Sequence, residues 1–190
     1  LLPYPPVRKS HTPQNKEEMR LFREKAKIKT SVYVSLILLA CFLLPIAPQR
    51  MGVSISSPWW THLSFLFFHA GFIHFLANAY AFYYFYSTWL FGRCTLPISI
   101  FIAILSSFLA VSTAPTVGFS GVVFALIGIN AVYYMSARYF VSVSIVLGAG
   151  FLWPSFNSLM HLLCFILGFI AAYLYKHLAP YIDEYRRINS

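Results

Sequence analysis

The sequence predicts an all-α membrane protein with six transmembrane helices and with both termini on the cytoplasmic side. Hydrophobic residues make up 59% of the 190 positions and charged residues only 10%, whereas charged residues are about a quarter of an ordinary soluble domain. Between Thr30 and Tyr175, only Arg50, Arg93 and Arg138 carry a full charge. Uncharged runs of this length are typical of helices that cross a bilayer.

The uncharged runs divide into six helices at about 20 residues for each span. The expected helices are the runs 30–47 and 70–91, two in the run 94–137 separated at 112–118, and two in the run 139–175 separated at 154–157. The segment 48–68 contains Pro58, Trp59 and Trp60, and we expect it to lie at the membrane surface, where tryptophan is favoured.

The basic residues orient the helices. Residues 1–29 hold eight of the fourteen basic residues, and Arg93, Arg138 and Lys176 follow the second, fourth and sixth helices. Basic flanks of this kind indicate the cytoplasmic side and not a nucleic-acid-binding surface. The expected organisation is a basic cytoplasmic segment, a membrane domain and a cytoplasmic tail, at 1–29, 30–177 and 178–190.

Three cysteines lie within or beside apolar runs, and they are odd in number: Cys41, Cys94 and Cys164. They are expected to act as small packing residues, because neither their number nor their spacing suits a disulfide or metal framework. No metal, nucleotide or organic cofactor is indicated by the sequence.

The membrane domain has no carboxylate, because no acidic residue lies between Glu24 and Asp183. Proteolysis by paired carboxylates and carboxylate proton relays are therefore excluded there. No histidine is followed by glutamate, which excludes a zinc hydrolase with an H-E-x-x-H motif. Histidine is the ionisable residue that remains within the spans, at His69, His74 and His161.

Several polar side chains are expected at one depth. At a rise of 1.5 Å per residue, Asn78 and His161 lie roughly 23 Å from the next basic residue of the inner surface, Ser120 roughly 27 Å and His74 roughly 29 Å. All four then lie in the outer part of a hydrocarbon core about 30 Å thick. A single histidine would more simply be a packing contact between helices, but four polar groups at one level indicate a site.

Ser120 stands in the tetrapeptide Gly118-Phe-Ser-Gly121, where a turn becomes the fourth helix. Flanking glycines allow close approach, and a helix N-terminus offers unpaired N–H groups, as a serine nucleophile requires. The motif alone is equally typical of an ordinary N-cap. His161 strengthens the catalytic interpretation, because small residues on both helices would let them pack closely: Gly121, Ala125 and Gly128 on one, Cys164 and Gly168 on the other.

With no carboxylate present, Ser120 and His161 would form a catalytic dyad. His74 and Asn78, four residues apart, share one face of the second helix and could donate hydrogen bonds to an oxyanion. The alternative for this pair is hydrogen bonding that only joins helices.

These motifs resemble the rhomboid family of intramembrane serine proteases. The resemblance is carried by His69-Ala-Gly-Phe-Ile-His74-Phe-Leu-Ala-Asn78, by Gly118-Phe-Ser120-Gly121, and by His161 followed by Gly168. It implies that Ser120 is the nucleophile and His161 the general base. It also implies oxyanion donors from His74, Asn78 and the backbone at Gly118 and Ser120, a mainly structural His69, and a membrane-embedded first loop at about 48–68.

Two positions depart from the pattern that the family often shows. A Trp-Arg pair in the first loop is here Trp60-Thr61, and a glutamate near the inner end of the second helix is absent around Thr88. Both usually support packing of the loop and the helix, so the departures concern stability more than chemistry.

The sequence thus predicts an intramembrane serine endopeptidase that cuts in or near transmembrane helices of membrane-protein substrates. The expected partners are such substrates and membrane lipids, and the expected location is a bacterial inner membrane, multi-pass. One alternative is a rhomboid-like pseudoprotease that binds transmembrane clients without cleavage. Less favoured alternatives are a small channel or transporter, and a protease that works within a larger assembly through its basic N-terminal arm.

Overall fold

The computed structural model describes residues 16–86, 94–134, 136–151 and 156–188. Eight helices account for most of these residues, and their only β-type pairing is an isolated antiparallel bridge between Val53 and Thr116. The helices are α1 (Lys16–Phe42), α2 (Pro48–Met51), α3 (Thr61–Ser64), α4 (Phe72–Phe85), α5 (Thr95–Leu109), α6 (Ser120–Ala131), α7 (Ala137–Phe151) and α8 (Ser158–Ile188).

The first and last long helices extend beyond the runs expected from hydropathy. Helix α1 begins at Lys16, because residues 16–29 lack Pro and Gly and are rich in good helix formers. It ends at Phe42, shortly before Pro45. Helix α8 continues past residue 177 and through Pro180 to Ile188. The expected segment boundaries at 29 and 177 therefore fall inside continuous helices.

The four helices between them match the expected positions more closely. The breaks at 112–118 and 154–157 separate α5 from α6 and α7 from α8, and the expected second helix corresponds to α4. The inner end of that expected helix, with Thr88, lies outside the described residues.

The surface segment forms two short helices joined by turns. Val53 and Thr116 exchange backbone hydrogen bonds of 3.0 and 2.9 Å, which join this segment to the turn before α6. Trp59 and Trp60 are exposed, as suits an interfacial element. Thr61 is buried, and its hydroxyl donates to the Pro58 carbonyl at 2.7 Å. The residue that departs from the family pattern thus stabilises the turn locally.

Helix α6 is the centre of the bundle, since every residue from Gly121 to Ala131 is buried. It packs most extensively on α8 and also contacts α4 and α5. A Cβ atom at Gly128 would collide with the Phe165 carbonyl of α8, and one at Gly168 would collide with the Ala125 carbonyl of α6. The predicted close packing of two small-residue faces is therefore confirmed.

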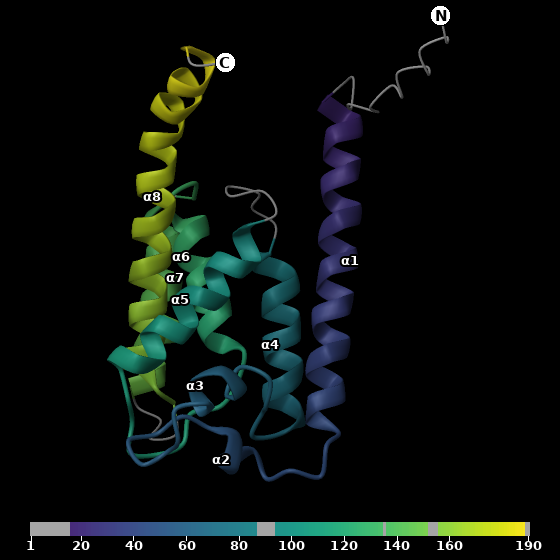
Figure 1. The fold of residues 1–190 in the computed structure, drawn as a ribbon, viewed down its shortest axis with the longest axis vertical. Coiled ribbons are helices and arrows are strands. Elements are labelled where there is room, and N and C mark those ends of the chain that lie inside the picture. The colour runs from purple at the N-terminus through teal and green to yellow at the C-terminus, as the bar shows by residue number, and fades with distance from the viewer. Residues whose placement is uncertain (1–15, 87–93, 135, 152–155, 189–190) are drawn as a thin grey trace, which may run out of the picture.

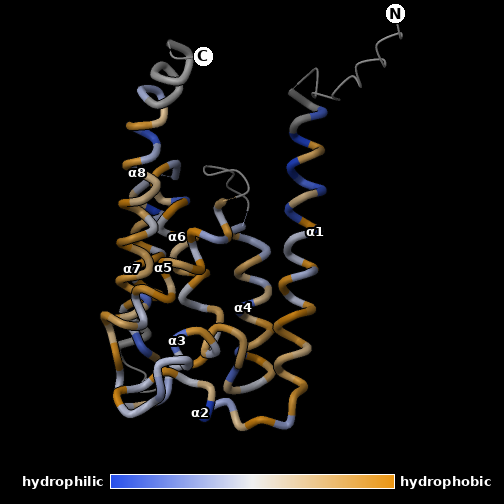
Figure 2. The backbone as a smooth tube through the Cα atoms, viewed as in Figure 1, coloured by the Kyte–Doolittle hydropathy of each residue, from blue (hydrophilic) through white to orange (hydrophobic). Residues whose placement is uncertain are grey.

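Figure 1 shows α1 standing at one edge of the bundle beside α4, with α8 at the opposite edge. The N-terminal end of α1 and the C-terminal end of α8 point to the same end of the molecule, and α2 and α3 lie at the other end. In Figure 2 the hydrophilic residues of α1 are gathered in its N-terminal half, away from α2 and α3. Both chain ends thus emerge on one side.

Among the described residues, one helix is long and apolar enough to cross a membrane by itself, at Ser158–Tyr181. Three shorter apolar helices lie at Thr95–Leu109, Ser120–Ala131 and Ala137–Gly148. The 12 residues of α6 span about 18 Å, which is well short of a core about 30 Å thick. The six-span count therefore stays a prediction.

Candidate active site

Ser120 is the first residue of α6, and the turn before it is shaped by a glycine. Gly118 has φ of 124°, a conformation that side-chain-bearing residues rarely adopt. A Cβ atom there would lie 2.7 Å from Cε1 of His74. Gly118 therefore lets the chain turn into α6 while the His74 ring packs directly against the turn.

The Ser120 hydroxyl and the His161 ring form a direct hydrogen bond. The distance from Ser120 Oγ to His161 Nε2 is 2.7 Å, although 41 residues separate them in sequence. His161 lies in the first turn of α8 and is only 3% exposed. Its ring lies against Phe124 and Phe156, with centroid distances of 4.6 and 4.3 Å. These two rings fix the plane in which the imidazole faces Ser120.

The other nitrogen of His161 has an unusual environment. Within the described ranges, Nδ1 is buried and has no hydrogen-bond partner. For Nε2 to accept a proton, Nδ1 must carry the ring hydrogen. The orientation of this base therefore depends on aromatic packing and on the backbone of α8, in the absence of a carboxylate.

Asn157 was not expected to contribute to the site. It immediately precedes α8, and its Oδ1 accepts a hydrogen bond from the Met160 N–H at 3.1 Å, as an N-cap does. Its Nδ2 donates to the Ala110 carbonyl at 3.0 Å and to Thr116 Oγ1 at 3.1 Å. Asn157 thus ties the start of α8 to the chain leading into α6. An asparagine just before a hydrophobic run was the sequence signal for this cap.

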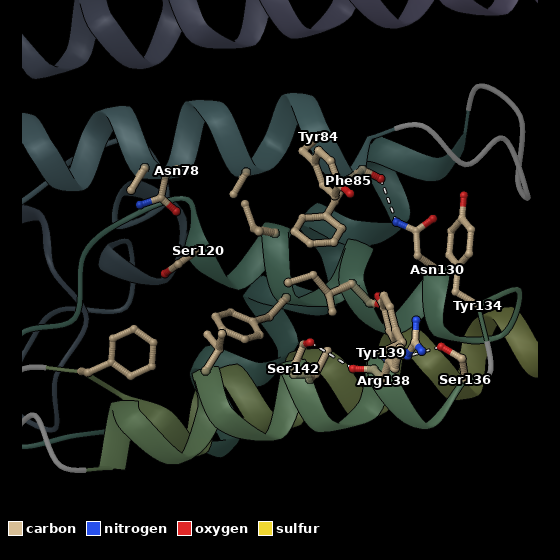
Figure 3. A pocket seen from close by; sticks show the side chains of 18 of the residues that line it. Asn78, Tyr84, Phe85, Ser120, Asn130, Tyr134, Ser136, Arg138, Tyr139 and Ser142 are labelled. Carbon is tan, nitrogen blue, oxygen red and sulfur yellow. Dashed lines mark hydrogen bonds between the residues drawn. The ribbon is translucent and has the colours of Figure 1, made fainter.

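His74 and Asn78 lie on the face of α4 that is directed at α6. One N–H of the Asn78 amide donates to the His74 carbonyl at 2.9 Å, which leaves its second N–H for another acceptor. His74 Nδ1 accepts from the Ala70 N–H at 3.4 Å, so the ring hydrogen is on Nε2. Both side chains line the same cavity as Ser120, and Figure 3 shows Asn78 and Ser120 on adjacent walls.

The turn before Ser120 uses two of its N–H groups for structure. Gly118 N–H donates to the Phe65 carbonyl at 2.8 Å, and Phe119 N–H donates to His69 Nε2 at 3.4 Å. Because the Gly118 N–H already has this acceptor, the residue contributes space and backbone conformation here, and its expected role as an oxyanion donor stays a prediction. The Ser120 N–H belongs to the first turn of α6, where a helix has no internal acceptor for it.

Two further histidines, at the end of the molecule that carries α2 and α3, hold loops in position. His69 is 1% exposed and contacts the edges of the His74 and Phe75 rings, in keeping with the structural role that the resemblance implies. The His62 ring in α3 stacks on the Phe108 ring, with a distance of 3.7 Å between the ring centroids. Its Nδ1 lies 2.9 Å from Ser107 Oγ. Burial lowers the pKa of His62, so its ring is neutral at pH 7 and joins α3 to α5.

A cavity of about 900 Å³ opens beside Ser120 (Figure 3). Helices α4 and α7 form its walls and α6 its floor, and most of its surface is apolar. It extends from Ser120 to Arg138, at the start of α7. The serine therefore faces a long, mainly apolar groove between helices, which suits an extended or helical apolar ligand.

Comparison with known families supports the resemblance in the motifs. The Rhomboid domain family model matches residues 56–178, which are 123 of the 190 positions and include Ser120, His161, His74 and Asn78. The comparison with curated proteins gives no match to this chain. Because the family model covers more than half of the sequence, and most of the described residues are helical with no strand among them, the chain belongs to the rhomboid family and is an integral, all-α polytopic membrane protein.

Proposed function

We propose that this protein is an intramembrane serine endopeptidase that hydrolyses peptide bonds in or near the transmembrane helices of membrane-protein substrates. Rhomboid proteins are generally intramembrane serine proteases, and some members are inactive. The observation that carries the proposal is the 2.7 Å hydrogen bond between Ser120 Oγ and His161 Nε2. A serine hydroxyl that is hydrogen-bonded to a histidine supports a protease over a protein that only binds transmembrane clients, because a binding protein needs no such pair.

In the proposed reaction, Ser120 Oγ attacks the substrate carbonyl carbon while its proton passes to His161 Nε2. The imidazolium then gives this proton to the leaving amine as the C–N bond breaks, which leaves an acyl ester on Ser120. A water molecule attacks the ester, again with His161 as base, and releases the carboxylic acid and the free serine. No carboxylate takes part, since the sequence has none between Glu24 and Asp183.

Three N–H groups are proposed to stabilise the oxyanion. They belong to the backbone of Ser120, the free N–H of the Asn78 amide and Nε2 of His74. Donors held before the reaction starts are worth several kcal/mol in a water-poor site, because they need no reorganisation as charge develops. The hydrogen bonds that orient Asn78 and His74, and the position of Ser120 in the first turn of α6, support this role.

The substrate is proposed to reach Ser120 through the groove between α4 and α7. A peptide bond inside a regular helix has its carbonyl hydrogen-bonded, so the substrate helix must unwind locally before attack. We therefore expect cleavage near small or helix-weakening residues. Because α6 spans only about 18 Å, Ser120 lies below the surface of the membrane, and water must reach it from the side of α2 and α3.

The proposed setting is a bacterial inner membrane, crossed six times, with both chain ends in the cytoplasm. The common direction of the α1 and α8 ends supports an even number of spans (Figure 1). The basic residues of α1 support the cytoplasmic assignment.

The test is cleavage of a transmembrane reporter substrate by the protein reconstituted in lipid vesicles. Ser120→Ala and His161→Ala should each lower kcat by at least about 10³-fold, because each removes one half of the dyad. Ser142→Ala is a matched control, since Ser142 lines the same groove and donates only to the Arg138 carbonyl of its own helix. It should keep its activity.

If the intact protein binds the reporter but never cuts it, and does so equally well as Ser120→Ala, the protease proposal fails. The pseudoprotease alternative would then account for the protein.

A further inference from the structure

The groove beside Ser120 has two chemically different ends. Ser120 and Asn78 lie at one end, and Lys27 of α1 and Arg138 of α7 lie at the other. Figure 3 shows Asn130, Tyr134 and Arg138 gathered at the end remote from Ser120. The walls between the two ends are mainly apolar. Proteolysis at Ser120 gives no reason for two cations at the far end.

The two basic residues at this end form no ion pair among the described residues. The nearest acidic residue in the sequence is Glu24, one helical turn before Lys27 on α1, and no acidic residue lies between Glu24 and Asp183. Lys27 approaches from one wall, with its Nζ 4.7 Å from the Tyr83 ring centre, and Arg138 approaches from the other wall, where it is exposed. Two cations that face one groove are complementary to an anion between them.

A buried polar atom at the same end also lacks a partner. Asn130 lines the groove and is 2% exposed. Its Nδ2 donates to the Phe85 carbonyl at 2.8 Å, whereas its Oδ1 has no hydrogen-bond partner among the described residues. A buried acceptor without a donor is unfavourable. A ligand that carries hydroxyl groups beside its anionic group would satisfy this atom.

The length of the groove matches one leaflet of a bilayer. Ser120 and Asn130 are ten residues apart on α6, which corresponds to about 15 Å. Half of a hydrocarbon core about 30 Å thick is also about 15 Å. An acyl chain that begins at the cationic end would therefore reach the region of Ser120.

We propose that this groove binds one anionic phospholipid with a hydroxylated headgroup. Its phosphate lies between Lys27 and Arg138, its headgroup hydroxyls near Asn130, and an acyl chain between α4 and α7. A transmembrane substrate would use the part of the groove near Ser120, whereas its cytoplasmic flank, rich in Lys and Arg, would be repelled at the cationic end. Anionic lipids are abundant in the cytoplasmic leaflet, where the proposed topology places this end.

The first test is native mass spectrometry of the full-length protein in detergent, titrated with phosphatidylglycerol or with phosphatidylcholine of the same acyl chains. The intact protein should bind one phosphatidylglycerol more tightly than phosphatidylcholine. Lys27→Gln with Arg138→Gln should weaken phosphatidylglycerol binding by roughly thirtyfold, at about fivefold for each charge. Binding of phosphatidylcholine should be unchanged.

The matched control is Lys29→Gln with Lys176→Gln. It removes the same charge. The Nζ atoms of Lys29 and Lys176 lie 5.9 and 5.8 Å from the ring centres of Tyr33 and Tyr133, and neither lysine lines the groove. This variant should bind phosphatidylglycerol like the intact protein. If both double variants lose affinity equally, or if neither does, the groove is not the site and the proposal is overturned.

A second test locates the acyl chain. Phosphatidylglycerol with a photoreactive diazirine near the end of its chain should form adducts with groove residues such as Val123 and Val146. Adducts confined to the exposed outer residues Phe101 and Ile145 would contradict the proposal. Excess glycerol phosphate should fail to displace the lipid, and full displacement would instead indicate a site for the soluble anion. These measurements need no protease activity, so they stand apart from the test of the dyad.

Discussion

His161, the proposed general base, has no carboxylate to orient its ring. Its Nε2 faces Ser120 at 2.7 Å, and its ring is held against Phe124 and Phe156. Aromatic packing can select a ring orientation, but it does not stabilise the imidazolium as a carboxylate would. We therefore assign a larger share of transition-state stabilisation to the oxyanion donors than in a Ser-His-Asp site.

The substitution Asn78→Ala tests how much the oxyanion donors stabilise the transition state. The substitution removes one oxyanion donor, so kcat should fall about 10²–10³-fold with little change in KM, because the donor acts mainly in the transition state. The measurement is steady-state cleavage of the reporter. Asn130→Ala is the control, since it removes a buried asparagine of the same groove that bonds the Phe85 carbonyl. Asn130→Ala should lower Tm and leave kcat within a few-fold of that of the intact protein. An equal loss of kcat in Asn78→Ala and Asn130→Ala would contradict the role of Asn78.

Gly118→Ala tests the turn that presents Ser120. Its φ of 124° and the 2.7 Å approach of His74 Cε1 leave no room for a Cβ atom. The substitution should cost roughly 1–3 kcal/mol of stability and remove most of the activity, as measured by thermal unfolding and cleavage. Gly71→Ala, in extended backbone with no neighbour within 4 Å, should change neither. Normal activity in Gly118→Ala would show that the turn is not constrained.

At this scale, the sequence motifs correctly indicated which side chains come together, because Ser120 and His161 stand at helix starts and the small residues point to their contact. They did not indicate how backbone groups are used. The bond from Gly118 to Phe65 and the triple contact of Asn157 depend on loops that are distant in sequence. Such bonds leave no periodic pattern.

The packing of α6 on α8 sets the distance within the dyad. Gly128 faces the Phe165 carbonyl so closely that no side chain fits. Gly128→Ala should therefore separate the helices, lower stability by about 1–3 kcal/mol and reduce cleavage. Gly148→Ala, in α7 with open space around it, should be neutral or stabilising by up to about 1 kcal/mol. Thermal unfolding in detergent, followed by reporter cleavage, would distinguish them, and equal stability in both variants would refute the argument.

The uncharged runs predicted which segments form helices, but they did not predict where each helix begins and ends. Hydropathy located the breaks before α6 and α8, but it could not show that α1 starts at Lys16, since a charged helix and a charged coil have similar hydropathy. It also treated residues 120–138 as one helix. Because α6 ends at Ala131, the helical rise from Ser120 to that end is about 17 Å and not 27 Å. The helix that follows Ser120 is therefore shorter than the sequence spacing suggested.

The whole molecule has one end that carries α2 and α3 and an opposite end at which α1 begins and α8 ends (Figure 1). Basic residues near aromatic rings mark the second end, at Lys27, Lys29 and Lys176. Such a distribution is typical of a cytoplasmic interface.

Cysteine labelling in sealed cells tests this orientation. In a background with Cys41, Cys94 and Cys164 replaced by alanine, Ile55→Cys should react with a membrane-impermeant maleimide from outside, because residue 55 is 73% exposed on the α2–α3 segment. Ser136→Cys, in the exposed turn between α6 and α7, should react only after the membrane is opened. The reverse pattern would invert the proposed topology.

The measurement that tests the central claim most directly is labelling of the reconstituted protein with a fluorophosphonate, followed by mass spectrometry of its peptides. An activated serine attacks this reagent, whereas an ordinary hydroxyl does not. We predict a single adduct on Ser120, absent in Ser120→Ala and strongly reduced in His161→Ala. Absence of any adduct on the folded protein, or an adduct on another serine, would contradict the assignment of a Ser120–His161 dyad.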